Sequence, residues 1–253
     1  MLRVLMERWR QQMRTVGFPR THPSLSDRYV GLPTLFPEKC RNEACQGCQA
    51  VCPTGAVGRD EAGLFLDLGR CIFCRACQIA CPSGAIAFGS DYRMAARQRE
   101  HLVLRGVPLP PLEPLEEDRR RLFVRSLRLR QVSAGGCMAC EADLNVLTTV
   151  VFDLGRFGID FVASPRHGDG VAVTGPVTRN MRDALLWTHE ASPDPRVVLA
   201  VGACAISGGI YAGLPETHDG APSLLPVDLF VPGCPPHPLT ILHGMLGLLG
   251  RLS

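Results

Sequence analysis

Long apolar runs are missing from this 253-residue chain. A helix that crosses a bilayer needs roughly 18–20 successive apolar residues, and the best candidate, residues 239–249, is shorter and contains His243. The opening MLRVLMERWRQQM carries arginine from its third position, so it lacks the apolar stretch of a secretory signal. We therefore expect a soluble, intracellular protein, and peripheral association with a membrane stays open.

The sequence also lacks the motifs that bind nucleotides or nucleic acid. No G-x-G-x-x-G follows an expected strand and no P-loop is present, so nucleotide binding has no support. The formal net charge is only +3, and no pattern typical of DNA binding is present. We expect no nucleic-acid partner.

Cysteine, by contrast, is abundant, with twelve in the chain. In a secreted protein this number would suggest disulfides. Because the chain shows no export signal, metal binding or redox chemistry is the better interpretation. The cysteines sort into three sets of four, and four thiolates are what one [4Fe-4S] cluster takes.

Residues 40–90 contain an internal repeat. Three cysteines recur 29 positions later, and the CPTGAV at 52–57 is matched by CPSGAI at 81–86. The pairs are Cys45 and Cys74, Cys48 and Cys77, and Cys52 and Cys81. A duplicated unit with so few large apolar residues cannot build much core, so it needs bound metal to fold.

The second copy, CIFCRACQIACP at 71–82, has the C-x2-C-x2-C-x3-C-P spacing of a bacterial ferredoxin. In that motif three thiolates bind one cluster, and the fourth, before proline, binds the other. Zinc sites favour two separated C-x-x-C pairs instead. The spacing therefore predicts two [4Fe-4S] clusters. One would be held by Cys71, Cys74, Cys77 and Cys52, and the other by Cys40, Cys45, Cys48 and Cys81.

The first copy departs from this spacing because its first gap has four residues instead of two. We expect residues 41–44 to bulge outward and the cluster to be a full cube. The alternative stays open that Cys40 is a poor ligand and that this cluster loses an iron.

Beyond the repeat, residues 106–126 have the proline-rich and charged composition of a semi-extended, solvated linker. Short β-rich runs then alternate with helical patterns, which indicates an α/β fold with a parallel sheet. We expect a flavodoxin-like sheet with helices on both faces, without inferring a flavin. The expected strands lie near 125–132, 159–163, 171–175, 197–202 and 227–233, and the expected helices at 141–154, 178–190 and 238–252.

The last four cysteines follow expected strands, and ligands bind beyond the carboxyl ends of strands in such sheets. Each lies in a motif that contains glycine or proline. Cys137 and Cys140 lie in GGCMACE, Cys204 in GACAISGG and Cys234 in VPGCPPHP. We predict that the fold gathers them around a third [4Fe-4S] cluster.

The stretches GGCMACEADL, SPRHGD, VTGPVTRNM, VGACAISGGIY and PVDLFVPGCPP resemble the 20-kDa subunit family of respiratory complex I. That family includes the small subunits of energy-converting [NiFe] hydrogenases and of formate hydrogenlyase. The two-residue separation of Cys137 and Cys140 is similar to hydrogenase-type members, whereas complex I members have adjacent cysteines. The stretch LGRCIFCRACQIACPSGAI resembles the two-cluster ferredoxin subunit of the same complexes, so two subunits look fused here.

The resemblance implies four segments. Residues 1–30 are an amphipathic helix and lead-in, 31–105 a bacterial-ferredoxin-like dicluster domain of the α+β class, 106–126 a linker, and 127–253 a domain like the 20-kDa subunit and hydrogenase small subunits.

The resemblance also implies an electron-transfer subunit with no catalytic site of its own. Its third cluster would face the active site of a [NiFe]-hydrogenase-like or complex I 49-kDa-like large subunit. Further partners would be membrane subunits, which would hold the chain on the cytoplasmic side of the inner membrane, and a donor such as a formate dehydrogenase or a ferredoxin. Two alternatives stay open: a nickel-free complex that reduces quinone or pumps ions, and a non-catalytic iron–sulfur sensor, which is disfavoured because no DNA-binding pattern is present.

By the same resemblance, three polar residues lie near the third cluster. Glu141 could relay protons at the large-subunit interface, or it could be a glutamate that the first turn of a helix favours. Arg166 and His167, in SPRHGD, could donate hydrogen bonds to the cluster sulfides, or they could belong to an ordinary polar loop.

Residues 1–13 have the pattern of an amphipathic helix, because the apolar Leu2, Trp9 and Met13, with Leu5 or Met6, fall on one face. The arginines fall elsewhere. Such a helix could contact a partner subunit, lipid headgroups or its own domain.

Overall fold

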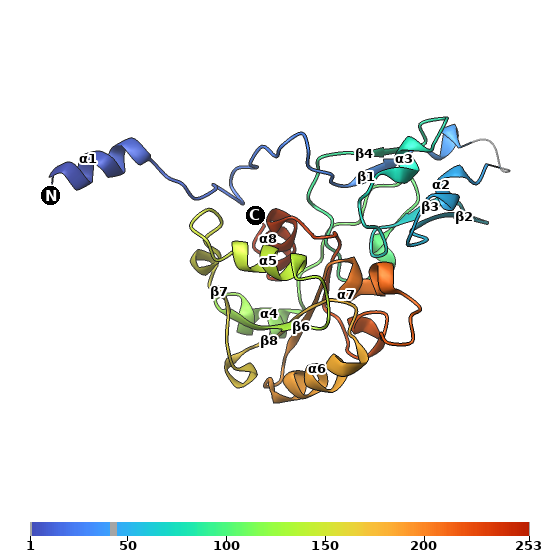
Figure 1. The fold of residues 1–253 in the computed structure, drawn as a ribbon. Helices are drawn as coiled ribbons and strands as arrows, with labels where there is room; N and C mark the ends of the chain where they lie inside the picture. The colour runs from blue at the N-terminus through green and yellow to red at the C-terminus, as the bar shows by residue number, and fades with distance from the viewer. Residues whose placement is uncertain (1, 41–44, 253) are drawn as a thin grey trace.

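The C-terminal half of the protein is built on a five-stranded parallel sheet, as a computed structural model that describes residues 2–40 and 45–252 shows (Figure 1). The strands are β6 (Leu127–Ser133), β7 (Ile159–Phe161), β8 (Gly170–Thr174), β9 (Val197–Val201) and β10 (Leu229–Val231). Their order in the sheet is β7-β6-β8-β9-β10, and every neighbouring pair is parallel. This is the 2-1-3-4-5 order of flavodoxin-like folds, so the predicted fold class is confirmed.

Both faces of this sheet are covered, because alternate residues of each strand point to opposite sides. On one face Val132, Val173 and Ala200 lie in a buried cluster with residues of α6 (Arg179–Ala191) and α7 (Ala203–Ser207). On the other face Leu129, Leu199 and their neighbours pack with α5 (Ala139–Val146) and α8 (Pro238–Leu248). Figure 1 shows α5 and α8 on one side of the sheet and α6 on the other.

Two expected helices end earlier than predicted. The helix expected over 141–154 stops at Val146, because the hydroxyls of Thr148 and Thr149 donate to the carbonyls of Asn145 and Val146 at 2.8 and 2.7 Å. Such bonds compete with continued helix. The helix expected over 238–252 stops at Leu248, because Gly250 takes φ +67° and closes the last turn.

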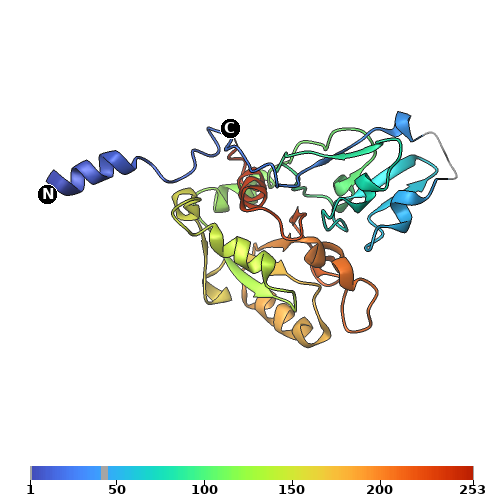
Figure 2. The same cartoon turned by 45° about the horizontal axis from the view of Figure 1, so that its top comes forward.

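The N-terminal half contains two small antiparallel sheets and two single helical turns. β1 (Pro33–Leu35) pairs with β4 (Ile86–Phe88), and β2 (Val57–Asp60) and β5 (Val103–Leu104) flank β3 (Gly63–Asp67). The turns α2 (Gly47–Ala50) and α3 (Ala76–Ile79) lie in the two copies of the repeat and contact each other. Figure 2 shows this half beside the larger sheet.

The segment predicted as a solvated linker is partly packed, which corrects that prediction. Residues 117–123 form α4 (Glu117–Phe123), in which Phe123 is buried. Leu115 is also buried, and its amide donates to the carbonyl of Leu248 at 2.8 Å. Apolar residues inside the charged stretch therefore fasten it to the C-terminal core, which a reading of composition overlooks.

Several short 3-10 helices complete the fold. They are η1 (Pro37–Lys39), η2 (Arg99–Leu102), η3 (Leu154–Phe157), η4 (Pro165–His167), η5 (Gly209–Tyr211) and η6 (Ala221–Ser223). The N-terminal helix α1 (Leu2–Gln11) projects from the body in both views (Figures 1 and 2). Within residues 2–40 and 45–252, no helix combines the length and apolar character that crossing a bilayer requires.

Candidate iron–sulfur sites

The two copies of the repeat build the same turn around their last cysteine. Sγ of Cys52 accepts a hydrogen bond from the amide of Ala56 at 3.2 Å, and Sγ of Cys81 accepts one from the amide of Ala85 at 3.3 Å. In each turn the intervening glycine has positive φ, +60° and +64°. Glycine adopts that conformation without steric cost, so the shared C-P-x-G-A sequence explains the shared geometry.

These turns favour the thiolate form of both cysteines. Burial alone would raise the pKa of Cys52 and of Cys81, but hydrogen bonds from the backbone and from the hydroxyls of Thr54 and Ser83 outweigh it, so the pKa of each thiol is lowered. The thiolate is the form that binds metal. Each turn therefore prepares a ligand before the metal arrives.

One cavity is lined by the four cysteines that we predict as a set. It is small, and Cys52, Cys71, Cys74 and Cys77 lie around it with Leu66 and Phe88 among the apolar neighbours. Burial raises the pKa of Cys71 to about 12 and that of Cys77 to about 11, and the charges of the neighbouring cysteines add to it. Four thiolates crowded in an apolar cavity need a positive centre to offset their charge. The residues present therefore fit an iron–sulfur cluster.

The other ferredoxin set is described except for the residues that follow Cys40. Burial, and then the charges of Cys81 and Cys40, raise the pKa of Cys48, which indicates that these three sulfurs lie together. Cys45 is exposed. The predicted bulge at residues 41–44 lies outside the described residues.

Arg59, on β2, contacts this set and has no signal in the cysteine spacing. Its Nη2 donates to the carbonyl of Cys40 at 2.6 Å and reaches Sγ of the same residue at 3.6 Å. A cationic donor at a cluster sulfur stabilises the reduced state and raises the potential. The pairing depends on β2 folding back over the first cysteine, which the spacing does not reveal.

The third set comes together at the carboxyl edge of the large sheet. Cys137 and Cys140 follow β6, Cys204 lies in α7 after β9, and Cys234 follows β10. Burial comes first in raising the pKa of Cys140, and the charges of Cys204, Glu141, Cys234 and Cys137 follow. Burial and two of these cysteines likewise raise the pKa of Cys204 to about 11. β6 and β8 flank the point where the strand order reverses, which is where flavodoxin-like folds bind ligands.

Two glycines make room for the sulfurs of this set. A Cβ on Gly202 would lie 2.5 Å from Sγ of Cys140, and one on Gly209 would lie 2.9 Å from Sγ of Cys204. Both glycines have positive φ. The backbone at the sheet edge is therefore shaped around these two sulfurs, as a cluster site requires.

Glu141 is buried beside Cys140, with 6% of its surface exposed. Its Oε1 accepts hydrogen bonds from the hydroxyls of Ser133 at 2.6 Å and Thr174 at 2.7 Å. Ser133 and Thr174 end the paired strands β6 and β8. The carboxylate is thus fixed between the sheet edge and the cysteine loop, where either a structural role or proton transfer is chemically available.

Arg166 and His167 lie elsewhere along the sheet. Both are exposed on η4, between β7 and β8, and the next amide but one, of Asp169, donates to the carbonyl of Arg128 at 2.6 Å. Arg128 lies near the start of β6, whereas the cysteines follow its end. Their contact with a cluster stays a prediction.

The two halves meet beside two of the cysteine sets. Oγ of Ser207, in α7 with Cys204, donates to the carbonyl of Gly69 at 2.8 Å, two residues before Cys71. The Gly69 loop is held by the buried carboxylate of Asp67, which accepts from the Gly69 amide at 2.8 Å and from Arg99 at 2.6 Å. Buried residues of both halves, such as Leu66 and Ile206, also belong to one cluster. The contact therefore links the two sites through packed protein.

Around the third set the surface is partly apolar. Cys137 and Cys234 are exposed, and Met138 is 70% exposed. Ile210, whose backbone hydrogen bonds to the sulfur of Cys204, is 56% exposed. Exposed apolar side chains next to a candidate redox site are typical of a surface that a partner covers.

In the described ranges 2–40 and 45–252, no three or more His, Cys, Asp or Glu side chains form a site for a metal ion. Cys52, Cys71, Cys74 and Cys77 line a small cavity instead, and in a cubane each thiolate binds a different iron. Fold and cysteines together define the class: an iron–sulfur protein in which a ferredoxin-like part is joined to a flavodoxin-like sheet.

Comparison with known proteins agrees with this class. The 4Fe-4S binding domain family matches residues 64–87, and the NADH ubiquinone oxidoreductase 20-kDa subunit family matches residues 137–248. The chain belongs to the NADH ubiquinone oxidoreductase 20-kDa subunit family. The predicted family and the presence of [4Fe-4S] binding in the N-terminal half are confirmed.

Similar proteins are named as subunits of a hydrogenase, a formate hydrogenlyase and an NADH-quinone oxidoreductase. The probable membrane-bound hydrogenase subunit mbhJ of Pyrococcus furiosus is 40% identical over 129 residues, which are 51% of this chain and 77% of that protein. Formate hydrogenlyase subunit 7 of Escherichia coli is 38% identical over 153 residues, or 58% and 60% of the two chains. An NADH-quinone oxidoreductase subunit of Citrifermentans bemidjiense is 38% identical over 121 residues, or 47% and 69%.

Proposed function

We propose that this chain is the electron-transfer subunit of a membrane-associated, complex-I-like oxidoreductase and carries three [4Fe-4S] clusters. Two would lie in a dicluster domain at 31–105 and the third in the domain at 127–253. The observation that carries the proposal is the closeness of the cysteines in two sets, one containing Cys71 and the other Cys204, which the Gly69–Ser207 contact joins. The ligands would be Cys40, Cys45, Cys48 and Cys81; Cys52, Cys71, Cys74 and Cys77; and Cys137, Cys140, Cys204 and Cys234.

The contact between the halves supports one order of electron transfer. Bound clusters supply one-electron chemistry. The set that contains Cys71 lies next to the loop at Gly69, which Ser207 of α7 contacts, so it is the intermediate step toward the set that contains Cys204. The set that contains Cys40 would then be the outer end, where an electron donor such as a ferredoxin binds. The chain itself would supply the ligands, the hydrogen bonds to the clusters and the packed protein between them.

The exposed surface around Cys137, Met138 and Cys234 supports a large partner there. We propose a [NiFe]-hydrogenase-like large subunit, since a membrane-bound hydrogenase subunit and a formate hydrogenlyase subunit are among the relatives. Glu141 would lie at the edge of that interface and hold a proton between the third cluster and the active site of the large subunit. Membrane subunits of the same complex would keep the assembly at the bilayer.

A second candidate keeps the same electron path but ends it in a nickel-free partner that reduces quinone or drives ion pumping. The 38% identity to a subunit of an NADH-quinone oxidoreductase favours it. Purification of the intact complex separates the two. Nickel in the co-purified large subunit, together with paired C-x-x-C motifs near both its ends, supports the first candidate, and their absence supports the second.

The number of clusters is tested by anaerobic iron and sulfide analysis of the purified chain. Three cubes give about twelve iron and twelve sulfide per chain. A value near eight would remove one cluster. Cys234→Ser should then abolish one cluster signal in electron paramagnetic resonance and spare the other two, whereas loss of all three would contradict separate cluster domains.

A further inference from the structure

The helix α1 carries an apolar stripe that the rest of the chain leaves uncovered. At 100° per residue, Leu2, Leu5, Met6 and Trp9 fall within an arc of about 100°. No residue of α1 is buried, and Trp9 and Met13 are 88% and 93% exposed. Of the three surroundings open from the sequence, packing on its own domain is therefore wrong.

The helix is nevertheless held in a defined orientation at its C-terminal end. The hydroxyl of Thr15 donates to the carbonyl of Val150 at 2.7 Å, and the amide of Val16 donates to the carbonyl of Val151 at 2.8 Å. Nη2 of Arg156 donates to the carbonyl of Val16 at 2.8 Å. Phe18, two residues further on, is buried. The helix therefore leaves the body from an anchored strap.

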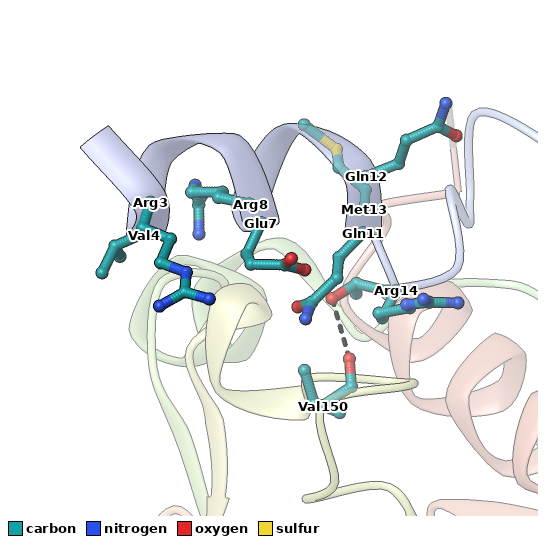
Figure 3. A pocket seen from close by; sticks show the side chains of 10 residues that line it. Arg3, Val4, Glu7, Arg8, Gln11, Gln12, Met13, Arg14 and Val150 are labelled. Atoms are coloured by element: carbon teal, nitrogen blue, oxygen red, sulfur yellow. Dashed lines mark hydrogen bonds between the residues drawn. The ribbon is translucent and has the colours of Figure 1, made fainter. Parts of the chain in front are cut away.

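The polar side of α1 faces the body. Figure 3 shows Arg3, Glu7 and Gln11 pointing toward the loop that carries Val150, with Val4 beside Arg3. These polar residues follow one another at a spacing of four, which places them on one face. The apolar stripe consequently points away from the rest of the chain.

The charged residues beside this stripe indicate what kind of surface it could contact. Arg3 and Arg10 border it on one side and Arg8 on the other, while Glu7 is the only acidic residue in 1–14. An apolar stripe bordered by arginine on both sides suits a surface that is apolar below and anionic on either side. That is the arrangement of acyl chains and headgroups in an anionic bilayer.

We propose that α1 lies in the interface of an anionic lipid membrane, with Trp9 and its apolar neighbours inserted and the arginines at the headgroups. In both views α1 lies at the opposite end of the molecule from α2 and β2 (Figures 1 and 2). Lipid contact through α1 would therefore hold the ferredoxin-like half away from the bilayer, open to a donor in solution. The inference adds a direct lipid contact to the proposed complex and does not depend on the reaction of the large subunit.

The test is co-sedimentation of the full-length, cluster-loaded chain with vesicles. Vesicles of phosphatidylcholine with one quarter phosphatidylglycerol should bind the chain at low salt. Vesicles of phosphatidylcholine alone, or high salt, should weaken binding by about tenfold or more, because screening removes the attraction of the arginines.

Two neutral substitutions separate the stripe from the polar side. Trp9→Gln should weaken binding to the anionic vesicles at least about tenfold, since it removes the largest inserted side chain. Gln11→Ala, on the side that faces the body, should change binding less than about twofold. Visible absorbance of the clusters should be the same in all three proteins, because α1 contributes nothing to the core.

The proposal is overturned if the chain does not sediment with anionic vesicles, or if Trp9→Gln binds them as well as the unchanged chain. A third result also overturns it. In that result the unchanged chain does not bind vesicles, and the complex purified in detergent with the Trp9→Gln variant lacks another subunit. The stripe would then dock a protein. Cluster content is measured separately. A chain that does not bind vesicles therefore does not contradict the proposed electron transfer.

Discussion

The two halves of this molecule arrange their cysteines in opposite ways. In the ferredoxin-like half, eight cysteines lie within residues 40–81, and the helices α2 and α3 that carry some of them are four residues long. In the C-terminal half, four cysteines are spread from 137 to 234 and lie in loops or at helix starts after strands β6, β9 and β10. The ferredoxin-like half brings its cysteines together mainly by their short spacing in the sequence. The C-terminal half brings its cysteines together by the folding of a sheet.

This difference in cysteine arrangement indicates which half of the molecule depends on bound metal to fold. The ferredoxin-like half buries apolar residues such as Leu64, Leu66 and Ile86, but the turns that carry its cysteines are only four residues long, so ligand bonds must hold those turns. The larger sheet has strands β8 and β9 buried along their whole length. That half therefore has a core of its own, and its cysteines are added at the edge.

Removing iron should give the largest effect and should affect the halves unequally. We expect an anaerobic chelator to expose amides of 47–60 and 74–88 to rapid hydrogen exchange, because their turns lose the ligands that fix them. Amides of β8 and β9 should stay protected. Mass spectrometry of exchanged peptides measures both, and equal loss of protection in the two halves would break the comparison.

Gly202→Ala should remove the third cluster alone. The new Cβ would lie 2.5 Å from Sγ of Cys140 at a backbone φ of +92°. We expect iron to fall from about twelve to about eight per chain, with the ferredoxin signals intact. Gly213→Ala is the matched control, since Gly213 also has positive φ but nothing lies within 4 Å of its Cβ position. Equal iron loss in both variants would show general strain instead of a blocked sulfur.

Arg99→Met should loosen the joint between the halves. It removes the nearer cationic partner of the largely buried carboxylate of Asp67 and leaves only Arg70 at 4.0 Å, at a cost of about 3 kcal/mol in the free energy of unfolding. Arg93→Met, which breaks an exposed pair with Asp91, should cost less than about 1 kcal/mol. Anaerobic denaturant titrations followed by cluster absorbance compare the two. Similar costs would mean that the buried pair does not hold the joint.

Arg59→Met should give the smallest effect, a shift of one potential in the ferredoxin-like half. Loss of the donor at Sγ of Cys40 should make the potential of that cluster more negative by some tens of millivolts. The cluster near Cys71 should not shift. Redox titration monitored by electron paramagnetic resonance resolves the two, and an unchanged potential would mean that Arg59 serves only the Cys40 carbonyl.

Much of the fold was predictable, because strand and helix patterns are local. The strands at 159–163, 171–175, 197–202 and 227–233 lie where alternation of β-rich and helical runs places them. Helix ends were less accessible. The stop at Val146 depends on two threonine hydroxyls that turn back onto carbonyls, and sequence periodicity does not register such bonds.

Burial of the segment at 106–126 and the role of Arg59 were not predictable for a related reason. Leu115 reaches the carbonyl of Leu248, and Arg59 reaches Cys40, only after distant parts of the chain are brought together. The composition of residues 106–126 predicted a solvated segment, and the cysteine spacing gave no prediction for Arg59. Contacts at long sequence separation leave no periodic trace.

The sequence by itself determined the turn at the end of each repeat copy, because the cysteine sulfur, the glycine and the alanine amide of C-P-x-G-A lie within five residues. It also determined the order of strands that places four further cysteines at one edge. Only the tertiary structure decided that these four sulfurs share one site, that Gly202 makes room for Cys140, and that Ser207 joins the two halves at Gly69. Those facts depend on how sheets and loops pack, and packing joins residues that the chain itself keeps far apart.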